Sequence, residues 1–256
     1  MSEAAEPSAP PADLEAAKLA ALAEFAAGAG HEINNPVAVI SGRAQLLLAG
    51  ETDPERRREL VTIHRQALRI REMISDLMHF ARPARPRFDL VDLREVLAGL
   101  LERQAARARA ARVELAWQPP SDPLLVQADR NQLAIALAAV VENALDALEA
   151  HPPADTAGRV TLTSAAAIDP GTGARSVRID VTDNGPGFGP DIRRHLFDPY
   201  FSGRSAGRGI GLGLSKCWRI VELHGGVLEV ASEEGKGATL SLILPASESP
   251  APAGPD

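Results

Sequence analysis

Residues 183–189 read Asp-Asn-Gly-Pro-Gly-Phe-Gly, and they directly follow an alternating apolar pattern that is typical of a β-strand. Three glycines within these residues allow a backbone to approach a ligand closely, because glycine has no side chain. Asp183 ends the predicted strand, where a rigid backbone can hold its carboxylate in place. Taken alone, the stretch favours an ordinary Asp-Asn-Gly turn. The segments around it therefore decide between a turn and a ligand site.

A second glycine-rich stretch follows at residues 207–215, which read Gly-Arg-Gly-Ile-Gly-Leu-Gly-Leu-Ser. It precedes a predicted helix at about residues 212–224. Backbone N–H groups and the positive end of a helix dipole are suited to binding phosphate. The stretch has neither the preceding strand and downstream acid of a dinucleotide fingerprint nor the Gly-Lys-Ser/Thr of a P-loop.

Asn143 lies on a mostly apolar predicted helix that follows the capping box Asp129-x-x-Gln132. A buried amide needs a partner, because an unpaired polar group costs on the order of 1–3 kcal/mol. Asn143 is therefore either a structural residue with its hydrogen bonds made within the protein or a side-chain oxygen for Mg²⁺, which prefers oxygen ligands.

The order and spacing of these segments, with Gly235-x-Gly237 after them, resemble the ATP-binding domain of histidine kinases. That domain belongs to the Bergerat-fold ATPases, and the resemblance covers roughly residues 88–245. It implies that Asn143 holds Mg²⁺ on the triphosphate of ATP. It also implies that Asp183 accepts a hydrogen bond from the adenine amino group, and that Gly185 and Gly187 shape the adenine pocket.

The resemblance extends through the following loop and helix start. Phe197 opens a stretch that looks like the family's F box, and residues 202–208 correspond to a short ATP lid. Arg204 either touches the γ-phosphate or is a solvated lid charge. The residues that would pack the lid and the helix start against the phosphates are Gly209, Gly211, Gly213 and Leu214.

One difference from the gyrase-like relatives bears on chemistry. They place a general-base Glu four residues before the magnesium Asn, and this chain has Ala139 at that position. The sequence therefore does not support the activation of water for ATP hydrolysis.

Residues 14–82 carry two helical stripes of apolar residues, one from Leu22 to Leu47 and one from Leu60 to Leu77. Gly50 and Asp53-Pro54 separate them, as expected for the end of one helix and the start of the next. The pattern predicts an antiparallel helical hairpin. Such a hairpin buries little by itself, so we expect a symmetric dimer that forms a four-helix bundle.

The first helix contains His31-Glu32-Ile33-Asn34-Asn35-Pro36. This motif resembles the H box of dimeric histidine kinases, especially the nitrogen-regulation-like group. His31 is off the apolar stripe and would be the phosphoacceptor, since a neutral imidazole is a nucleophile. Glu32 could accept the proton of the other ring nitrogen. In the family, the Asn35 position is associated with dephosphorylation of the partner, and Pro36 should bend the helix.

Two glycines, Gly28 and Gly30, lie just before His31, where relatives usually have Ser or Ala. Each costs roughly 0.5–1 kcal/mol against alanine in a helix. We hypothesise that they soften the helix at the phosphoacceptor. His64 on the second helix is interpreted as a packing or surface residue rather than a second phosphoacceptor.

Length and composition fit a two-domain globular protein: 256 residues with 45% hydrophobic and 24% charged residues. The net charge of −7 argues against nucleic-acid binding. A single cysteine excludes an intrachain disulfide, and the histidines show no metal-ligand spacing. The apolar run at residues 134–141 is far shorter than the roughly 20 residues that span a bilayer, and the N-terminus does not read as a secretion signal, so we expect a cytoplasmic chain.

The predicted fold class is α+β: the helical hairpin, then an α/β-sandwich ATP-binding domain of the Bergerat type. The segments are a disordered tail over 1–13, the dimerisation and phosphotransfer hairpin over 14–82, a linker over 83–87, the ATP-binding domain over 88–246 and a disordered tail over 247–256.

These features predict an ATP- and Mg²⁺-dependent histidine kinase that phosphorylates His31 and passes the phosphoryl group to an aspartate of a response-regulator receiver domain. It could also dephosphorylate that partner. The sequence shows no sensor domain, so the input would come from a separate sensor protein or a missing fragment. Two alternatives are a nucleotide-sensing scaffold without transfer activity and a dedicated receiver-domain phosphatase.

Overall fold

A computed structural model describes the chain except for residues 1–11, 82, 154–155, 170, 202–210 and 248–256. The chain divides into two compact units, Met1–Ala84 and Arg85–Asp256. Most of both predicted tails lies outside the described residues. Among the described residues, no helix combines the length and the apolar content needed to cross a lipid bilayer.

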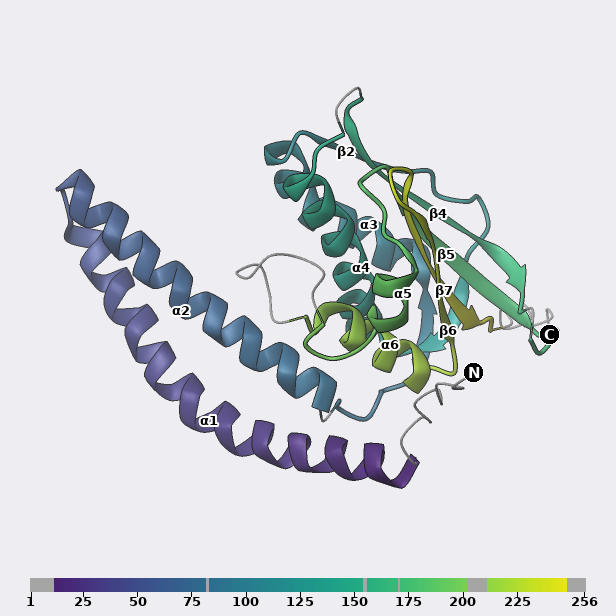
Figure 1. The fold of residues 1–256 in the computed structure, drawn as a ribbon, viewed down its shortest axis with the longest axis horizontal. Coiled ribbons are helices and arrows are strands. Elements are labelled where there is room, and N and C mark those ends of the chain that lie inside the picture. The colour runs from purple at the N-terminus through teal and green to yellow at the C-terminus, as the bar shows by residue number, and fades with distance from the viewer. Residues whose placement is uncertain (1–11, 82, 154–155, 170, 202–210, 248–256) are drawn as a thin grey trace, which may run out of the picture. The chain divides into compact units, whose positions relative to one another are not determined.

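The first unit is a hairpin of two helices, α1 (Ala12–Gly50) and α2 (Pro54–Ala81), which pack side by side (Figure 1). The Asp53 carboxylate accepts hydrogen bonds from the backbone N–H groups of Glu55 and Arg56, and so caps α2 as the sequence predicts. His64 is half-buried between the helices, with its Nδ1 3.0 Å from the Ser41 hydroxyl oxygen. This contact agrees with the packing role inferred for His64.

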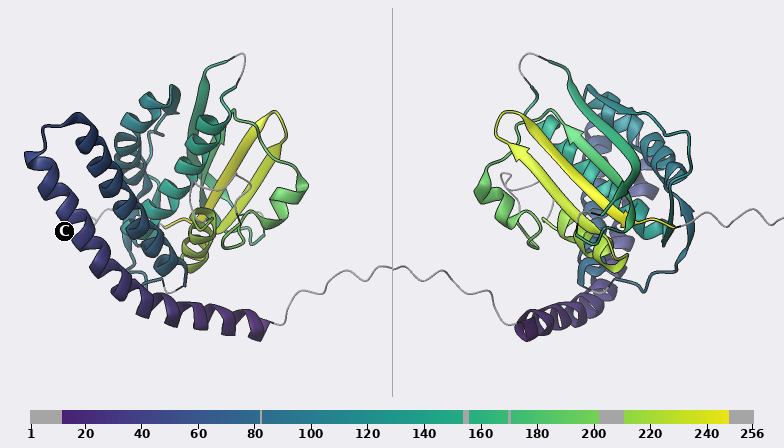
Figure 2. Two further views of the ribbon diagram at one scale, coloured as in Figure 1. Left: turned by 60° about the vertical axis from the view of Figure 1, so that its left-hand side comes forward. Right: turned by 90° about the vertical axis from the view of Figure 1, so that its right-hand side faces the viewer.

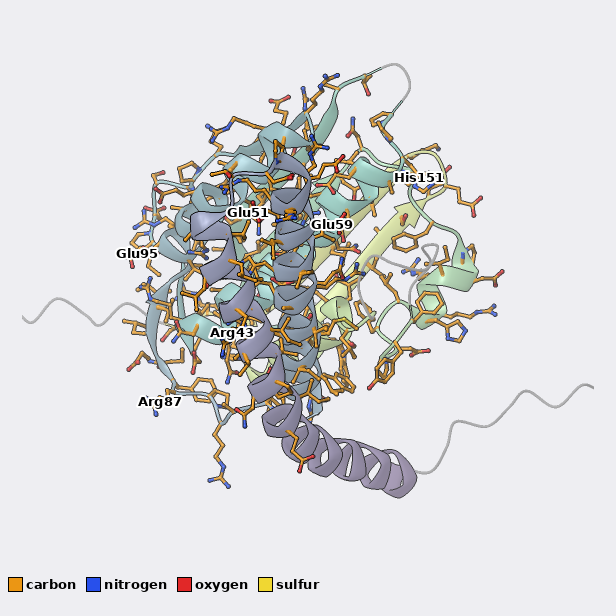
Figure 3. All side chains as sticks on the ribbon, turned by 90° about the vertical axis from the view of Figure 1, so that its left-hand side faces the viewer. Arg43, Glu51, Glu59, Arg87, Glu95 and His151 are labelled. Atoms are coloured by element: carbon orange, nitrogen blue, oxygen red, sulfur yellow. The ribbon has the colours of Figure 1, made fainter. Side chains whose placement is uncertain are left out.

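Only part of each apolar stripe is buried within the hairpin. Val37, Ala44 and Ala67 are buried, whereas Ile40 and Leu47 are 48% and 60% exposed. Charged side chains such as those of Arg43 and Glu59 lie at the hairpin surface (Figure 3). The hairpin therefore presents an apolar stripe that one chain does not cover.

The second unit contains a five-stranded sheet in the order β2-β4-β5-β7-β6. The strands β2 and β4 are parallel, and the other pairs are antiparallel. A separate two-stranded sheet pairs β1 with β3. The bounds are β1 Asp89–Asp92, β2 Val113–Trp117, β3 Leu125–Ala128, β4 Gly158–Ile168, β5 Arg175–Asp183, β6 Val227–Glu233 and β7 Gly237–Pro245.

Three helices, α3 (Leu93–Ala110), α4 (Arg130–Ala150) and α6 (Gly213–Leu223), cover one face of the large sheet (Figures 1 and 2). Their apolar sides and the inward residues of the strands form one core. Fully buried members include Leu97, Leu137, Leu145, Ile179 and Leu240. This two-layer arrangement is the predicted α/β sandwich, because each layer buries its apolar face against the other.

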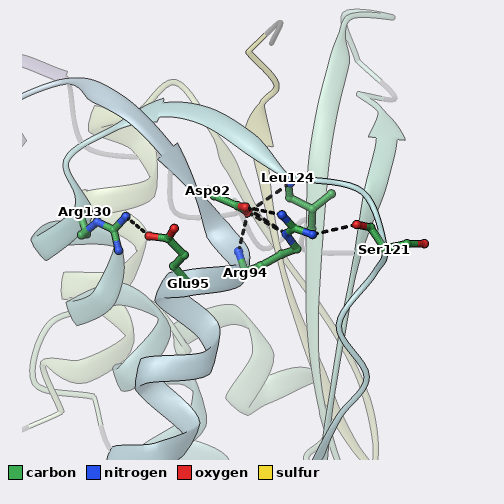
Figure 4. A network of polar contacts seen from close by, with 6 residues as sticks. All are labelled: Asp92, Arg94, Glu95, Ser121, Leu124 and Arg130. Atoms are coloured by element: carbon green, nitrogen blue, oxygen red, sulfur yellow. Dashed lines mark hydrogen bonds and ion pairs between the residues drawn. The ribbon is translucent and has the colours of Figure 1, made fainter.

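A polar network joins the start of α3 to the loop before β3 (Figure 4). The Asp92 carboxylate accepts from the backbone N–H groups of Arg94 and Leu124, and it also pairs with the Arg94 guanidinium. Burial alone would raise the pKa of Asp92, but these hydrogen bonds and the Arg94 charge outweigh it and lower the pKa. Arg94 also donates to the Ser121 carbonyl oxygen.

The predicted helical hairpin, the helix after Asp129, the strand that ends at Asp183 and the helix at about residues 212–224 are all present. Two short elements were not predicted: β1 and the six-residue helix α5 (Pro190–His195). Of the capping box predicted at Asp129, the side-chain cap is present but the reciprocal bond to Gln132 is not. The Asp129 carboxylate accepts from the N–H groups of Asn131 and Gln132, but its own N–H donates to His224 Nε2 at 3.0 Å rather than to Gln132.

Candidate functional site

The Asp183 carboxylate is buried at the end of β5, with only 5% of the residue exposed. Its Oδ1 accepts a hydrogen bond of 2.8 Å from the Gly185 N–H. A β-carbon on Gly185 would lie 2.8 Å from that same oxygen, so a side chain at 185 would displace the carboxylate. The loop therefore holds one acidic group at a fixed place beneath the end of the strand.

Asn184 ties this loop to the start of β4. Its Oδ1 accepts from the Arg159 N–H at 2.7 Å, and its Nδ2 donates to the Ala157 carbonyl at 3.0 Å. The Asn184 N–H also donates to the Arg159 carbonyl. Asn184 is thus a structural residue that fixes the direction in which the chain leaves Asp183.

The turn between β6 and β7 closes over the same loop. Gly187 has φ +60°, and a β-carbon there would lie 2.1 Å from the Glu233 carbonyl oxygen. The Gly235 N–H donates to the Pro186 carbonyl at 2.7 Å, and the Ser232 hydroxyl accepts from the Phe188 N–H at 2.9 Å. This close contact of two backbones explains why the loop needs its glycines.

Asn143 lies on α4 and is half-buried. Ala147, one turn later on the same side of the helix, lies next to the loop: its β-carbon would be 3.7 Å from one placed on Gly185. The α4 face that carries Asn143 therefore leads to the Asp183 loop. Ala139, one turn before Asn143, is buried and offers no base at that position.

The predicted F box and helix start lie after α5. Phe197 packs against the core of the unit. Gly211 has φ +70°, and a β-carbon there would be 2.4 Å from the Phe201 carbonyl oxygen, so Gly211 lies directly against the end of the F box. Gly213 begins α6, and Leu214 is buried. Leu212, the residue that caps α6, offers no side-chain hydrogen bond to the first turn.

Two predicted residues of this region, Arg204 and Gly209, lie outside the described residues, as does nearly all of the predicted lid. The side chain of His31 is also outside the description, although its backbone belongs to α1. Its predicted companions Glu32 and Asn35 are both exposed. The helix α1 continues through Pro36, and Figure 1 shows it curved.

The described part of the chain contains no group of three or more His, Cys, Asp or Glu side chains able to hold a metal ion. Mg²⁺ usually keeps several water ligands and commonly takes others from substrate phosphates. The amide oxygen of Asn143 has the chemistry to supply a protein ligand.

Sequence reasoning missed two contributors to the site and did not recognise the contact made by a third. Ser232 and the carbonyl of Glu233 contact the Asp183 loop from a distant turn, and no local pattern marks them. Gly237 was noted only as part of the family pattern, although it contacts Asp183 directly. The pair Gly235-x-Gly237 was the signal that could have located the contact.

Two family models match the chain. Residues 21–86 match the His Kinase A (phospho-acceptor) domain, and residues 128–248 match the histidine kinase-, DNA gyrase B- and HSP90-like ATPase domain. The first model includes His31, Glu32 and Asn35, and the second includes Asn143, Asp183 and the glycine-rich stretches. The second match shows that this unit is of the ATP-binding type.

Curated relatives include the sensor histidine kinase ZraS of Escherichia coli, 33% identical over 89% of this chain and 46% of ZraS. The C4-dicarboxylate transport sensor protein DctB of Pseudomonas aeruginosa is 34% identical over 90% of this chain and 37% of DctB. The chain thus spans less than half the length of these relatives.

Among solved structures, full-length ShkA in complex with AMPPNP matches with a TM-score of 0.73 and 30% identity, over 90% of this chain and 47% of ShkA. The histidine kinase ThkA in complex with the response regulator protein TrrA shares the fold, with a TM-score of 0.60 and 23% identity over 90% of this chain and 63% of that one. The matches to both family models, in the order and at the positions of the motifs, lead to one conclusion. The chain belongs to the sensor histidine kinases of two-component signal transduction.

Proposed function

We propose that this chain is an ATP-dependent protein histidine kinase core that phosphorylates its own His31 and transfers the phosphoryl group to an aspartate of a response regulator. The observation that carries the proposal is the Asp183 loop. Its buried carboxylate is fixed by the Gly185 N–H, and the β6–β7 turn packs closely against the loop at its glycines. A carboxylate in such a position is suited to accept a hydrogen bond from the adenine amino group.

The binding roles follow from where the residues lie. Gly185 and Gly187 allow the close backbone packing that holds Asp183 where it could meet the adenine base, and Phe197 packs against the core of the unit. The first turn of α6, with Gly213 and Leu214, offers N–H groups and the positive dipole end to the phosphates. Gly211 packs against the backbone of the F box at Tyr200 and Phe201. Arg204 and Gly209 keep their proposed lid roles on the strength of the sequence alone.

Mg²⁺ would neutralise charge on the β- and γ-phosphates, and Asn143 is the residue we expect to bind it. In the transfer, an imidazole nitrogen of His31 forms a bond to the γ-phosphorus. The bond from that phosphorus to the bridging oxygen breaks, and ADP leaves with the electron pair. Glu32 is placed next to His31 in the chain and would accept the proton of the other ring nitrogen.

A response regulator is the proposed partner, because the match to the phosphoacceptor domain covers α1 from residue 21 and all of α2, and the related ThkA structure contains the regulator TrrA. The exposed apolar stripe at Ile40, Leu47, Ile63 and Ile70 supports a homodimer built on the hairpin. We expect this region to act in the cytoplasm, where ATP and receiver domains meet. The exposed Asn35 supports a phosphatase activity toward the same partner.

The deciding experiment is incubation of the chain with γ-labelled ATP and Mg²⁺, followed by tests of the label in acid and alkali. We compare wild type with His31→Gln, and we use His64→Gln as the matched control, since His64 is a histidine of the same hairpin held by Ser41. Acid-labile, alkali-stable label that is lost in His31→Gln and kept in His64→Gln is the expected result. Nucleotide binding without any label would instead support the scaffold or the dedicated phosphatase.

A further inference from the structure

His224 lies just after α6 and is buried, with 6% of the residue exposed. Its Nδ1 is 2.8 Å from the Ile220 carbonyl oxygen, and its Nε2 is 3.0 Å from the backbone nitrogen of Asp129. A carbonyl oxygen accepts and a backbone N–H donates, so the two contacts require a proton on Nδ1 and none on Nε2. His224 is therefore held as one neutral tautomer that joins the end of α6 to the start of α4.

The same two residues hold the chain where it enters this unit. The Arg87 N–H donates to the Asp129 carboxylate at 3.0 Å. The phenyl ring of the next residue, Phe88, contacts the imidazole of His224 edge-on, with ring centroids 5.3 Å apart and an interplanar angle of 62°. Immediately after Phe88 the strand β1 begins, and Asp89 pairs with Ala128, the residue before Asp129. The backbone from Arg87 onward is thus attached to the body of the unit, although the Arg87 side chain itself is at the surface (Figure 3).

The charge at Asp129 fits this arrangement. Burial opposes its ionisation, but the N–H groups of Arg87, Gln132 and Asn131 together lower its pKa. Asp129 thus accepts hydrogen bonds both from the incoming chain and from the first turn of α4. His224 fixes the backbone of Asp129 from the other side.

We propose that His224 is a positioning residue for autophosphorylation. Through Asp129 and Phe88 it fixes the segment Arg87–Phe88 to the ATP-binding unit, and this confines the hinge between the two units to residues 83–86. That hinge is short and contains Pro83 and Pro86, which restrict its backbone. Release of Arg87 and Phe88 would lengthen the tether by about 3.3 Å per residue and lower the fraction of time that ATP and the phosphoacceptor meet in reactive geometry.

The effect should fall on the reaction rate and not on ATP binding. Asp129 lies at the start of α4, roughly 20 Å along the helix axis from Asn143. The hydrogen bonds and ring contact of His224, Phe88 and Arg87 are made with one another, with Ile220 and with Asp129, away from the Asp183 loop. The proposal rests on the proposed kinase function for its kinetic readout only, because attachment of the segment can be measured without any activity.

Two conservative variants separate the hydrogen bond from His224 to Asp129 from the hydrogen bond to Ile220 at the end of α6. In His224→Gln the side-chain oxygen occupies the Nε2 position and can still accept from the Asp129 N–H. In His224→Asn the amide occupies the Nδ1 position and can still donate to Ile220, but it cannot reach Asp129. His224→Phe retains a ring beside Phe88 and loses both hydrogen bonds.

The first readout is limited trypsin digestion of the full chain. Between residues 82 and 88 only the Arg87–Phe88 bond is a trypsin site, since Arg82 and Arg85 are each followed by proline. We expect cleavage after Arg87 to accelerate several-fold in His224→Asn and His224→Phe and to stay near wild type in His224→Gln, because protection follows local opening. Cleavage after Arg175, the exposed first residue of β5, is the internal control. Equal cleavage in all four proteins would overturn the proposal.

The second readout is the autophosphorylation rate against ATP concentration. We expect kcat to fall about tenfold in His224→Asn and His224→Phe, with KM for ATP unchanged and rescue in His224→Gln. A rise in KM that matches the fall in kcat, or equal losses in Asn and Gln, would show a merely structural role and overturn the proposal. If the wild type carries no label at all, the proposed function fails. The trypsin comparison still tests whether His224 attaches the segment Arg87–Phe88 to the ATP-binding unit.

Discussion

A β-carbon placed on Gly237 would stand 2.0 Å from the carbonyl oxygen of Asp183, so these two residues meet backbone to backbone. Gly237 also has φ +86°, a conformation that residues with side chains rarely adopt. The contact joins the first residue of β7 to the last residue of β5, where the buried carboxylate lies. The position of the proposed adenine acceptor therefore depends on a glycine more than fifty residues away in the chain.

This contact makes Gly237→Ala a sharp test, with Gly235→Ala as its matched control. Both glycines have positive φ, near +80° and +86°, so alanine costs about 1–2 kcal/mol at either position. A β-carbon on Gly235 meets nothing within 4 Å, whereas on Gly237 it collides with Asp183. We expect Gly235→Ala to keep nucleotide binding and Gly237→Ala to lose it, with a further loss of about 3 kcal/mol in the free energy of unfolding.

Denaturant titration and binding of a fluorescent ATP analogue measure the two effects. Equal stability and equal nucleotide affinity for the two variants would contradict the contact between the β6–β7 turn and the Asp183 loop.

Asp183→Asn tests the role of the carboxylate itself. The asparagine oxygen can still accept from the Gly185 N–H, so the loop should keep its shape. The new amide group is a donor, and it would face the donor of the adenine amino group. We expect ATP affinity to fall roughly 10- to 100-fold, with little change in melting temperature and with the preference for ATP over GTP lost. Unchanged discrimination between ATP and GTP, measured by calorimetry, would assign Asp183 a structural role only.

Gly28→Ala tests the hypothesis that glycine softens α1 before the phosphoacceptor. A β-carbon on Gly28 meets nothing within 4 Å, so the substitution removes flexibility without a collision. We expect the hairpin to gain roughly 0.5–1 kcal/mol of stability and the autophosphorylation rate to fall. Gly30→Ala is less clean, because its β-carbon would lie 3.4 Å from Met78 Sδ. A more stable Gly28→Ala protein with an unchanged rate would eliminate the hypothesis.

Much of this architecture could be predicted because its signals are local. The capping Asp53-Pro54 and the periodic apolar residues on either side of it define the hairpin from adjacent positions. The alternation in residues 176–182 and the glycines after Asp183 likewise define β5 and its loop. In each case the residues that determine the backbone conformation are neighbours in the chain.

The features that escaped prediction depend on distant partners. β1 is a four-residue strand whose pairing partner, β3, lies beyond α3 and β2. The Asp129 N–H would bond Gln132 in an ordinary capping box, and it bonds His224 because the fold brings the end of α6 there. The His224 side chain bonds Ile220 at the end of its own helix, but its second bond, to Asp129, could not be read from any local pattern.

Asp92 gives a prediction for the dependence of stability on pH. Its pKa is lowered in the folded protein, so its charge contributes stability that is fully present above the unfolded value near 3.8 and is lost as the pH falls through the folded value. In Asp92→Asn the helix cap is retained but the charge facing Arg94 is not. We expect a deficit of about 1–2 kcal/mol in the free energy of unfolding at pH 7, because hydrogen bonds to a charged group are lost.

That deficit should shrink as the pH is lowered from 5 toward 2, since the wild-type carboxylate becomes protonated over this range. Glu95→Gln is the matched control from the same network (Figure 4): Glu95 pairs with Arg130 at the surface, with the two side chains 62% and 51% exposed. An exposed pair contributes little, so its loss should change stability by less than about 1 kcal/mol at pH 7. Urea unfolding of the three proteins across this pH range gives the comparison. A deficit in Asp92→Asn that is independent of pH would mean that packing, and not the charge of Asp92, stabilises the start of α3.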